Sequence, residues 1–412
     1  MAAPEKKNKK VRVDFRQNRG QRRRSDDWTK RYHEDTEKLA DTLSGESVRP
    51  KGDLSRKRTI CVDADESPII DESLWRPGVV TLIHGQICRV EDESGRRWDC
   101  TVRRVLRTLL IEQRSSVTVG DRVWFGPAPM AESKDEAGIG VIERVEPRKT
   151  LLSRGARIGH DKQRGGHRRQ HLIAANVDQL IIVTSAAQPA FKPHLVDRYL
   201  VAAGKGDLRP IICVNKCDLI AADQRVTVVD EEDDEGDHLE DDTTGHTFEE
   251  VLDEFRKLGY CVIETSATRG DGIEQLRAEL KNRTSVFSGQ SGVGKSSLLN
   301  AIQPGLELEV GEVSDENEKG RHTTTHARLI RLEFGGYVVD TPGIRSFDLW
   351  NVEPGELEGL FCELAPVIAK CRFNDCHHLD EAGCAVIEAM QDGRISPRRY
   401  FSYVKMLNEI RR

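Results

Sequence analysis

The feature that most constrains this chain is the order of four short polar motifs, each of which comes after an apolar run typical of a buried β-strand. Asn-Lys-Cys-Asp at residues 215–218 comes first, and Ser-Ala at 266–267 comes second. The glycine-rich sequence G-Q-S-G-V-G-K-S follows at 289–296, and Asp-Thr-Pro-Gly at 340–343 comes last. Together these motifs are typical of a GTPase, in which the glycine-rich loop ordinarily leads. The order therefore predicts a circularly permuted domain.

The glycine-rich segment matches the full phosphate-loop pattern G-x-x-x-x-G-K-[ST]. Its glycines let successive backbone N–H groups point at phosphate oxygens, and a helix that begins there directs its positive end at the same anions. Lys295 would place its charge on the β- and γ-phosphates, and Ser296 would offer its hydroxyl to Mg²⁺. A simple glycine-rich turn is disfavoured, because a strand pattern precedes the segment and a helix pattern follows it. The predicted nucleotide-binding residues are Gly289, Gln290, Ser291, Gly292, Val293, Gly294, Lys295, Ser296 and Ser297.

Two further motifs are predicted to recognise the base. A carboxylate at Asp218 can accept hydrogen bonds from N1–H and the 2-amino group of guanine, a donor pair that adenine lacks, and so selects GTP over ATP. Ser266 and Ala267 would lie over the base. Each motif alone is as readily a surface turn, but their combination beside a phosphate loop favours a guanine site. The predicted base-recognition residues are Asn215, Lys216, Cys217, Asp218, Ser266 and Ala267.

The last motif is predicted to monitor the γ-phosphate. Asp340 would hold Mg²⁺ through water, and the backbone N–H of Gly343 would contact the γ-phosphate. The predicted switch residues Thr323, Thr324 and Thr325 lie between the phosphate loop and Asp340. Either Thr324 or Thr325 would join Ser296 as a magnesium ligand, and the spacing leaves the choice between the two threonines open.

The position after Gly343 departs from a common GTPase pattern. Many GTPases place there a glutamine that orients the attacking water, but this chain has Ile344, which cannot do so. We therefore expect slow intrinsic hydrolysis. His322, in the predicted switch segment, is a candidate for positioning water; the alternative is a histidine that contacts RNA or solvent.

A cluster near the C-terminus has the spacing of a metal site, C-x₄-C-x-H-x₅-C. Three thiolates and one imidazole suit a closed, tetrahedral Zn²⁺ site with no open position for chemistry. The alternative is a set of free cysteines in a small helical domain. The predicted zinc ligands are Cys371, Cys376, His378 and Cys384. Arginines that follow predict a basic surface: Arg394, Arg398, Arg399, Arg411 and Arg412.

The pattern of apolar residues predicts two further kinds of architecture. About five short strands in residues 78–145, separated by turn signals, predict a small closed barrel. An OB-fold fits that number of strands and commonly binds RNA; a barrel with a purely structural role is the alternative. From residue 179 to residue 339 strands alternate with helices, which predicts a mainly parallel sheet covered by helices.

Composition excludes several classes of protein. Of 412 residues, 37% are hydrophobic and 32% are charged, and we find neither a signal peptide nor an apolar run that approaches the roughly 20 residues of a membrane span. The ten cysteines do not resemble a secreted disulfide framework, so we expect a cytoplasmic protein.

The first 24 residues include ten Lys/Arg and two acidic residues, which favours contact with nucleic acid over a solubility tail. Residues 230–242 include ten acids and are expected to form a disordered loop insertion.

The motif order, G-Q-S-G-V-G-K-S-S at 289–297, G-R-H-T-T-T at 320–325, D-T-P-G-I-R at 340–345 and the cysteine–histidine spacing closely resemble the RsgA (YjeQ) family of GTPases. The resemblance covers about residues 78–412. It implies an OB-fold, a permuted GTPase domain and a zinc domain. It also implies that the protein docks on the 30S ribosomal subunit late in maturation, that the ribosome accelerates GTP hydrolysis, and that hydrolysis drives release.

The predicted fold class is therefore multidomain: a small OB-fold β-barrel, an α/β P-loop GTPase domain that is circularly permuted, and a mainly helical zinc-binding domain. The predicted boundaries are a basic, largely disordered extension at 1–75, the barrel at 76–150, a basic linker at 151–170, the GTPase domain at 171–350 with an acidic insertion at about 221–247, and the zinc domain at 351–412. Expected partners are GTP and GDP, Mg²⁺, one structural Zn²⁺, and the 30S subunit with its rRNA, without a membrane and with the protein as a monomer. Two alternatives remain: a large-subunit assembly GTPase, and an RNA-binding scaffold with a poorly active nucleotide pocket.

Overall fold

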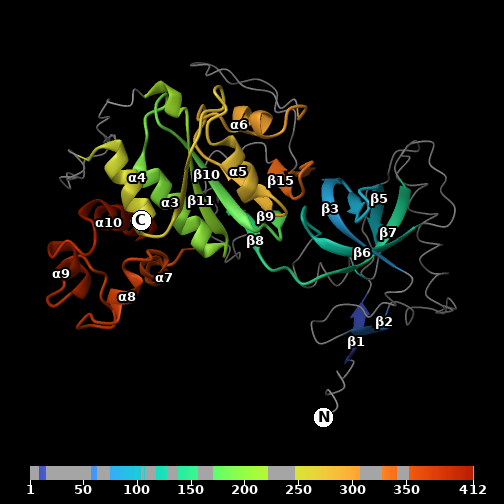
Figure 1. Cartoon of the computed structure of the whole chain (residues 1–412). Helices are drawn as coiled ribbons and strands as arrows, with labels where there is room; N and C mark the ends of the chain where they lie inside the picture. Colours follow the sequence, from blue (N-terminus) through green and yellow to red (C-terminus); the bar gives the residue numbers. More distant parts are fainter. Residues whose placement is uncertain are drawn as a thin grey trace, which may run out of the picture. The chain divides into compact units, whose positions relative to one another are not determined.

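The computed structural model describes residues 9–14, 57–62, 75–103, 106, 117–127, 138–155, 170–220, 246–306, 327–340 and 352–411 (Figure 1). They divide into two compact units. The first comprises Met1–Leu151 with Ile173–Asn176 and His326–Leu329, and the second holds the rest of the chain. The acidic run at 230–242 lies outside the described residues, as do residues 109–111 of the segment predicted to form the barrel.

The first unit contains a closed five-stranded barrel. Its strands are β3 (Arg76–His84), β4 (Ile87–Asp92), β5 (Arg97–Val102), β6 (Arg122–Pro127) and β7 (Gly138–Val145). The order is β3-β4-β5-β7-β6, and β6 pairs with β3 to close the barrel; β5–β7 is the parallel pair among antiparallel ones. Inward-facing Val80, Val90, Phe125 and Ile142 are fully buried beside Trp98. The prediction of a small OB-like barrel is confirmed.

Two short strands lie within the predicted N-terminal extension. β1 (Lys9–Asp14) pairs antiparallel with β2 (Lys57–Val62), with Lys9 opposite Val62. The remainder of residues 1–74 lies outside the described part of the chain. The expected disorder of that segment stays a prediction.

The second unit is built on a parallel sheet. Its strands are β10 (Gln179–Ser185), β11 (Arg209–Asn215), β12 (Cys261–Glu264), β13 (Thr284–Ser288) and β15 (Tyr337–Asp340). They lie in the order β12-β11-β10-β13-β15, and each neighbouring pair is parallel. The chain first moves outward from β10 through β11 to β12, then returns to β13 on the other side of β10. The order of strands in space thus changes direction between β10 and β13, and such a switch point is where α/β sheets bind ligands.

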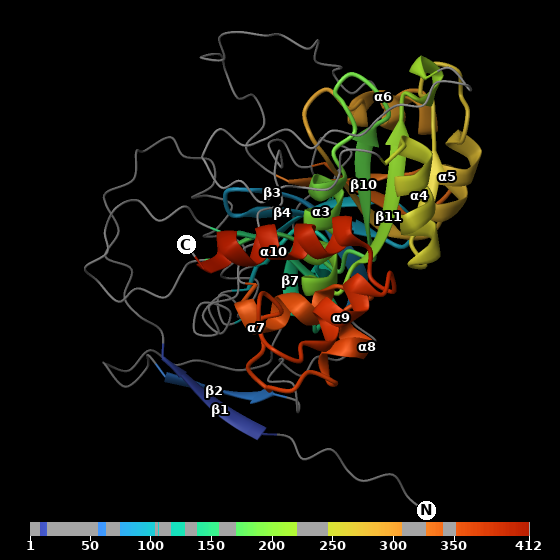
Figure 2. The ribbon, with the colours of Figure 1, turned by 90° about the vertical axis from the view of Figure 1, so that its left-hand side faces the viewer.

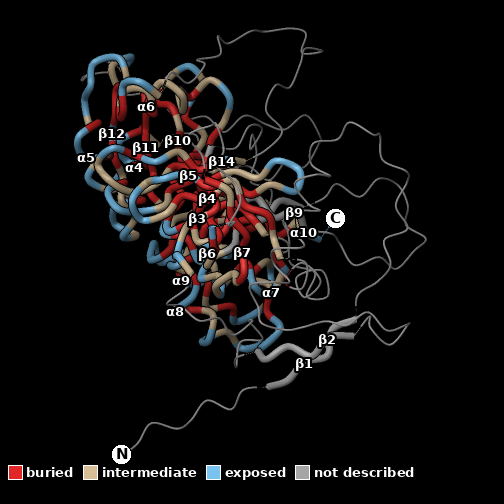
Figure 3. The backbone as a smooth tube through the Cα atoms, turned by 90° about the vertical axis from the view of Figure 1, so that its right-hand side faces the viewer, coloured by how far each residue is buried: buried red, intermediate tan, exposed pale blue. Residues whose placement is uncertain are grey.

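Helices cover both faces of this sheet: α3 (Pro193–Lys205) and α4 (Phe248–Lys257) on one side, α5 (Ile273–Leu280) and α6 (Lys295–Ile302) on the other (Figure 1). Side chains of a strand alternate between the two faces. Ile181 and Val183 therefore pack with α5 and α6, whereas Ile182 faces Leu195 and Tyr199 of α3. The central strands are accordingly buried along most of their length (Figure 3). Shorter elements are β8 (Leu151–Gly155), β9 (Gln170–Ala175), η2 (Cys217–Leu219) and β14 (Arg328–Arg331).

The C-terminal part of the second unit is helical, as α7 (Pro354–Leu357), η3 (Glu358–Leu360), α8 (Ala365–Ile368), α9 (Ala385–Gln391) and α10 (Pro397–Arg411). The helical turns of η3 end at Leu360, and α8 begins at Ala365 with Pro366 in its first turn, where a missing N–H costs no helix hydrogen bond. The buried core of this helical part includes Leu357, Phe361, Tyr403 and Leu407.

Candidate nucleotide site and metal centre

The predicted nucleotide motifs converge at one edge of the sheet. Residues 215–218 begin with the last residue of β11, residues 266–267 follow β12 closely, and the phosphate loop at 289–296 follows β13 directly. Because all these strands are parallel, their carboxyl ends lie at the same edge, beside the switch point. Asp340 ends β15 at that edge as well.

Asn215 connects three of these loops. Its side chain is 1% exposed, and Nδ2 donates to the carbonyl oxygen of Val293 in the phosphate loop at 2.9 Å. Its Oδ1 accepts from the backbone N–H of Ala267 at 3.2 Å. Gly294 has a φ of 93°, and a Cβ atom there would lie 2.4 Å from Asn215 Nδ2. Glycine is therefore required at this position by backbone conformation and by space.

The phosphate loop leads directly into a helix. Gly292 also has a positive φ, and α6 begins at Lys295, so the first N–H groups of the helix adjoin the loop. Lys295 Nζ donates to the carbonyl oxygens of Gly289 and Gln290, both at 2.8 Å. The ammonium group thus lies over the loop that it is predicted to serve.

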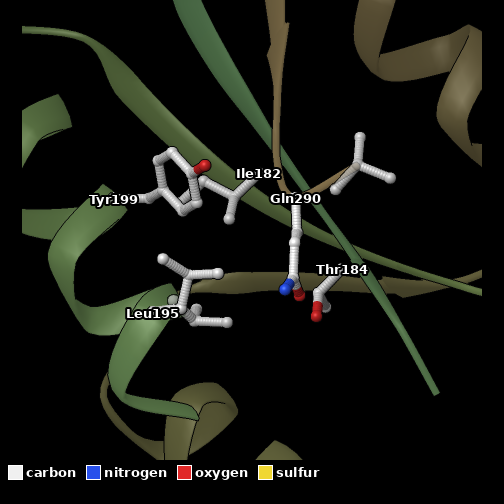
Figure 4. A pocket seen from close by; sticks show the side chains of 7 residues that line it. Ile182, Thr184, Leu195, Tyr199 and Gln290 are labelled. Atoms are coloured by element: carbon white, nitrogen blue, oxygen red, sulfur yellow. The ribbon is translucent and has the colours of Figure 1, made fainter. Parts of the chain in front are cut away.

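Beneath this loop is a small cavity, in which the side chain of Gln290 faces α3 (Figure 4). Ile182 and Thr184 of β10 and Leu195 and Tyr199 of α3 line it. Its volume of about 10 Å³ leaves room for about one water molecule. The cavity is part of the packing between the loop and α3, and it is too small for a nucleotide.

Asp218 is oriented by two hydroxyl groups. Ser266 Oγ donates to Oδ1 at 2.7 Å, and Thr268 Oγ1 donates to Oδ2 at 3.2 Å. The hydrogen bond from Ser266, which outweighs the small effect of burial, holds the pKa of Asp218 below its usual value. The carboxylate therefore stays charged and presents two acceptors in a fixed plane. Thr268 was not among the predicted residues; only its position two residues beyond Ser266 could have indicated it.

The other base-motif residues have distinct surroundings. Lys216 adopts a left-handed backbone conformation, with φ at 63°, and donates from Nζ to the carbonyl oxygen of Gln188. Burial raises the pKa of the Cys217 thiol to about 11, so this thiol is neutral at physiological pH. Cys217 therefore contributes packing to the motif.

Several predicted catalytic and switch residues fall outside the part of the chain that the structure describes. They are His322, Thr323, Thr324, Thr325 and Gly343, together with the side chain of Asp340. Their roles stay predictions.

The predicted metal ligands lie together in the C-terminal part. The donor atoms of Cys371, Cys376, His378 and Cys384 all lie within 4.8 Å of one another. His378 Nδ1 is 3.3 Å from Cys384 Sγ and 3.6 Å from Cys371 Sγ. Tetrahedral zinc with a Zn–N bond of about 2.1 Å and Zn–S bonds of about 2.3 Å would place the nitrogen about 3.6 Å from each sulfur, close to these two distances, so the cluster fits zinc. With four protein donors, it leaves no position for a reacting group.

The second nitrogen of His378 has a partner of its own. Nε2 lies 2.8 Å from Oε2 of Glu358, which is at the start of η3. A carboxylate there accepts a hydrogen from Nε2 and leaves the Nδ1 lone pair for a metal. Tyr400 also donates to the carbonyl oxygen of His378 at 2.7 Å, which fixes the backbone. No spacing rule in the sequence points to Glu358.

Comparison with known proteins agrees with this arrangement. A family model described as RsgA GTPase matches residues 145–350. The small ribosomal subunit biogenesis GTPase RsgA of Thermotoga petrophila is 40% identical over 339 residues, 82% of this chain and 98% of that protein. The chain belongs to the RsgA GTPase family.

Further RsgA relatives support the assignment. The protein of the same name from Saccharophagus degradans is 34% identical over 372 residues, 87% of this chain and 96% of its own length. The crystal structure of YjeQ from Thermotoga maritima matches with a TM-score of 0.58 and 37% identity over 82% of this chain and 99% of that one. YloQ, described as a circularly permuted GTPase, matches at 0.57 and 30% over 82% and 95%. The predicted family, its permuted domain and GTP hydrolysis as the enzymatic activity are confirmed.

In this RsgA family member, the C-terminal helical part that carries the cysteine–histidine cluster is joined to the GTPase sheet through α3. Asp197 of α3 is fully buried, and its carboxylate pairs with Arg398 at 2.9 Å and with Arg399 at 2.5 Å. The same arginines reach Glu254 of α4 at 2.7 Å and Glu363 at 2.5 Å. Figure 2 shows α10, which carries both arginines, beside α3. Burial by itself raises the pKa of Asp197, but the two guanidinium groups lower this pKa by more, so that it lies below its usual value.

This network corrects one prediction. Arg398 and Arg399 were expected on a basic surface, but they are only 4% and 1% exposed. Their charges are neutralised by carboxylates from elements far away in the sequence, which a local charge count cannot reveal. Arg394, in contrast, is exposed.

One face of α3 makes further contacts with the same part of the RsgA chain. Lys205 pairs with Glu356 at 2.6 Å, and Arg198 pairs with Glu409. His194 Nδ1 lies 2.8 Å from Ser402 Oγ. Since residues 194, 197, 198 and 205 recur at helical spacing, they share one face of α3, while Leu195 and Tyr199 face the sheet.

No helix within the described ranges is long and apolar enough to cross a membrane.

Proposed function

We propose that this GTPase binds the small ribosomal subunit and assists its late maturation, with hydrolysis stimulated by the subunit and coupled to release. The observation that carries the proposal is similarity over more than four fifths of the chain to proteins named small ribosomal subunit biogenesis GTPase RsgA. The intact base-recognition geometry supports GTP as the nucleotide. Such a role places the protein in the cytoplasm, and we propose that it acts as a monomer.

We propose that Asp218 reads guanine and that Lys295 neutralises the β- and γ-phosphates. Ser296, with Thr324 or Thr325, would bind Mg²⁺, which supplies charge neutralisation during phosphoryl transfer. Asp340 would hold the ion through water. Gly343 would contact the γ-phosphate, and His322 is the candidate for orienting water.

The cluster of three cysteines and His378 is proposed to bind one structural Zn²⁺. The supporting observation is the convergence of its four donor atoms within 4.8 Å. The domain boundaries predicted from the sequence also stay proposals, as does a contact between the basic N-terminal extension and rRNA.

Two other functions are less well supported. A large-subunit assembly factor does not agree with the names of the relatives, which specify the small subunit. A scaffold with an inactive pocket would not need the fixed carboxylate of Asp218 or the phosphate-loop Lys295.

Co-sedimentation with purified subunits tests the proposal. The full chain should pellet with 30S subunits in the presence of a non-hydrolysable GTP analogue, and less with GDP. It should not pellet with 50S subunits. Equal binding to both subunits, or binding to neither, would remove the assignment to the small subunit.

A further inference from the structure

The loop between the first two metal ligands exposes an aromatic ring. Phe373 is 45% exposed, and residues 372–375 are four consecutive exposed residues between Cys371 and Cys376. Six other phenylalanines are exposed by 6% or less, namely Phe125, Phe191, Phe248, Phe255, Phe287 and Phe361, and Phe334 and Phe401 are partly buried. In the described chain, Leu219 is the other exposed large hydrophobic residue. Among the described phenylalanines, Phe373 is therefore the one whose ring is exposed to solvent.

The loop that carries this ring is held at both ends. Cys371 and Cys376 belong to the four-donor cluster, and the backbone N–H of Arg372 donates to the carbonyl oxygen of Gly383 at 3.3 Å. A ring on such a loop loses little conformational entropy when a ligand stacks on it.

A cation accompanies the ring. The guanidinium carbon of Arg372 lies 5.4 Å from the centroid of Phe373. Arg398 and Arg399 also stack on phenylalanines, but both are buried in ion pairs. Within the residues that the structure describes, no carboxylate pairs with the exposed Arg372. Its charge is therefore available to an anionic ligand.

We propose that Phe373 and Arg372 form a stacking platform for an unpaired RNA base, with Arg372 also contacting the adjacent phosphate. Single-stranded RNA fits because it offers a flat apolar face next to a negative charge, and aromatic and arginine planes are the groups that stack on unpaired bases. Exposed Lys370 adds a second positive charge beside the loop. The inference rests on the proposed function, since it assigns to this loop a contact with the RNA of the subunit.

The test measures binding of a short, fluorescein-labelled single-stranded RNA and of 30S subunits to the full chain. F373A should weaken RNA binding by roughly 10-fold, the order expected for loss of one stacked base. F373W should bind like the wild type, and F373L, which keeps the apolar bulk without the aromatic face, should bind like F373A. R372A should also weaken binding. R394A removes an exposed arginine from the same part of the chain and should change neither affinity.

Zinc content and intrinsic GTP turnover should be unchanged in every variant, which separates the effect from misfolding. Wild-type affinity in F373A would overturn the platform, and so would wild-type affinity in F373L, since it would leave only an apolar contact. If 30S subunits bind F373A normally and also stimulate its GTP turnover, the proposal of a platform is wrong and the proposed function stands. If the wild type binds the RNA through Phe373 but ignores 30S subunits, the proposed function fails instead.

Discussion

Asn215 Nδ2 donates a hydrogen bond to the carbonyl oxygen of Val293 at 2.9 Å, which joins residues 78 positions apart. The first belongs to the base motif and the second to the phosphate loop. In this permuted chain the two motifs occur in reversed order, yet the bond holds them together. The strand order β12-β11-β10-β13-β15 brings them to one edge whichever strand comes first in sequence.

Asn215→Ala should therefore weaken GTP binding as a whole. The substitution leaves the buried Val293 carbonyl and the Ala267 N–H without their partner, at a cost of about 1–3 kcal/mol each. We expect a loss of affinity of about 10-fold or more, measured by titration with a fluorescent GTP analogue. Thr184→Ser, at the cavity beneath the loop, is the matched control and should bind normally. Unchanged affinity in the alanine variant would show that the bond does not support the site.

Asp197→Asn should destabilise the protein by about 3–5 kcal/mol. The substitution leaves two buried guanidinium groups with one fewer counter-charge. Glu409→Gln breaks an exposed ion pair between the same helices, α3 and α10, and should change stability by less than about 1 kcal/mol. Thermal unfolding of both variants checks the difference. Equal melting temperatures would contradict the account of the buried network.

His194 should make stability depend on pH. Burial, opposed by Asp197, lowers the pKa of His194 from 6.5 to about 4. Between pH 6.5 and about 4, the unfolded chain binds a proton at this histidine and the folded chain does not. The folded state therefore carries no penalty from His194 above about pH 6.5, and it loses stability relative to the unfolded chain as the pH falls towards 4. At pH 5 the loss is on the order of 2 kcal/mol. The melting temperature of His194→Gln should fall less than that of the wild type between pH 7 and pH 5; parallel decreases would refute the assignment.

Glu358 should strengthen metal binding through His378. Its carboxylate lies 2.8 Å from His378 Nε2, and loss of such a partner typically lowers metal affinity 10- to 100-fold. Competition with a chelator should show this loss for Glu358→Ala and a smaller one for Glu358→Gln, which keeps an acceptor. The visible spectrum of the cobalt-substituted protein should shift only in these variants. Glu388→Gln, an exposed change on α9, is the control; if it matches Glu358→Ala, a specific role for Glu358 is excluded.

The elements that could be predicted from sequence are those with strong local signals. Strand β11 is built around a continuous apolar run, within the alternation of strands and helices predicted for residues 179–339. The cysteine–histidine spacing likewise locates a cluster that could hold a metal ion, because all four donors lie in a short segment. Local residue types were sufficient for these features.

What could not be predicted depends on distant partners. Arg399 lies in a basic stretch, and only the tertiary fold brings Asp197 against it. Glu358 and Thr268 are ordinary polar residues until packing sets them against His378 and Asp218. Long-range placement, which no local pattern encodes, decided these roles.

GTP turnover in the presence of purified ribosomal subunits tests the central claim most directly. We predict slow turnover by the protein alone, because Ile344 cannot orient water, and strong stimulation by 30S but not by 50S subunits. Lys295→Ala, measured in parallel, should show no turnover under any condition. Turnover that 30S subunits leave unchanged, or that survives in Lys295→Ala, would contradict the account.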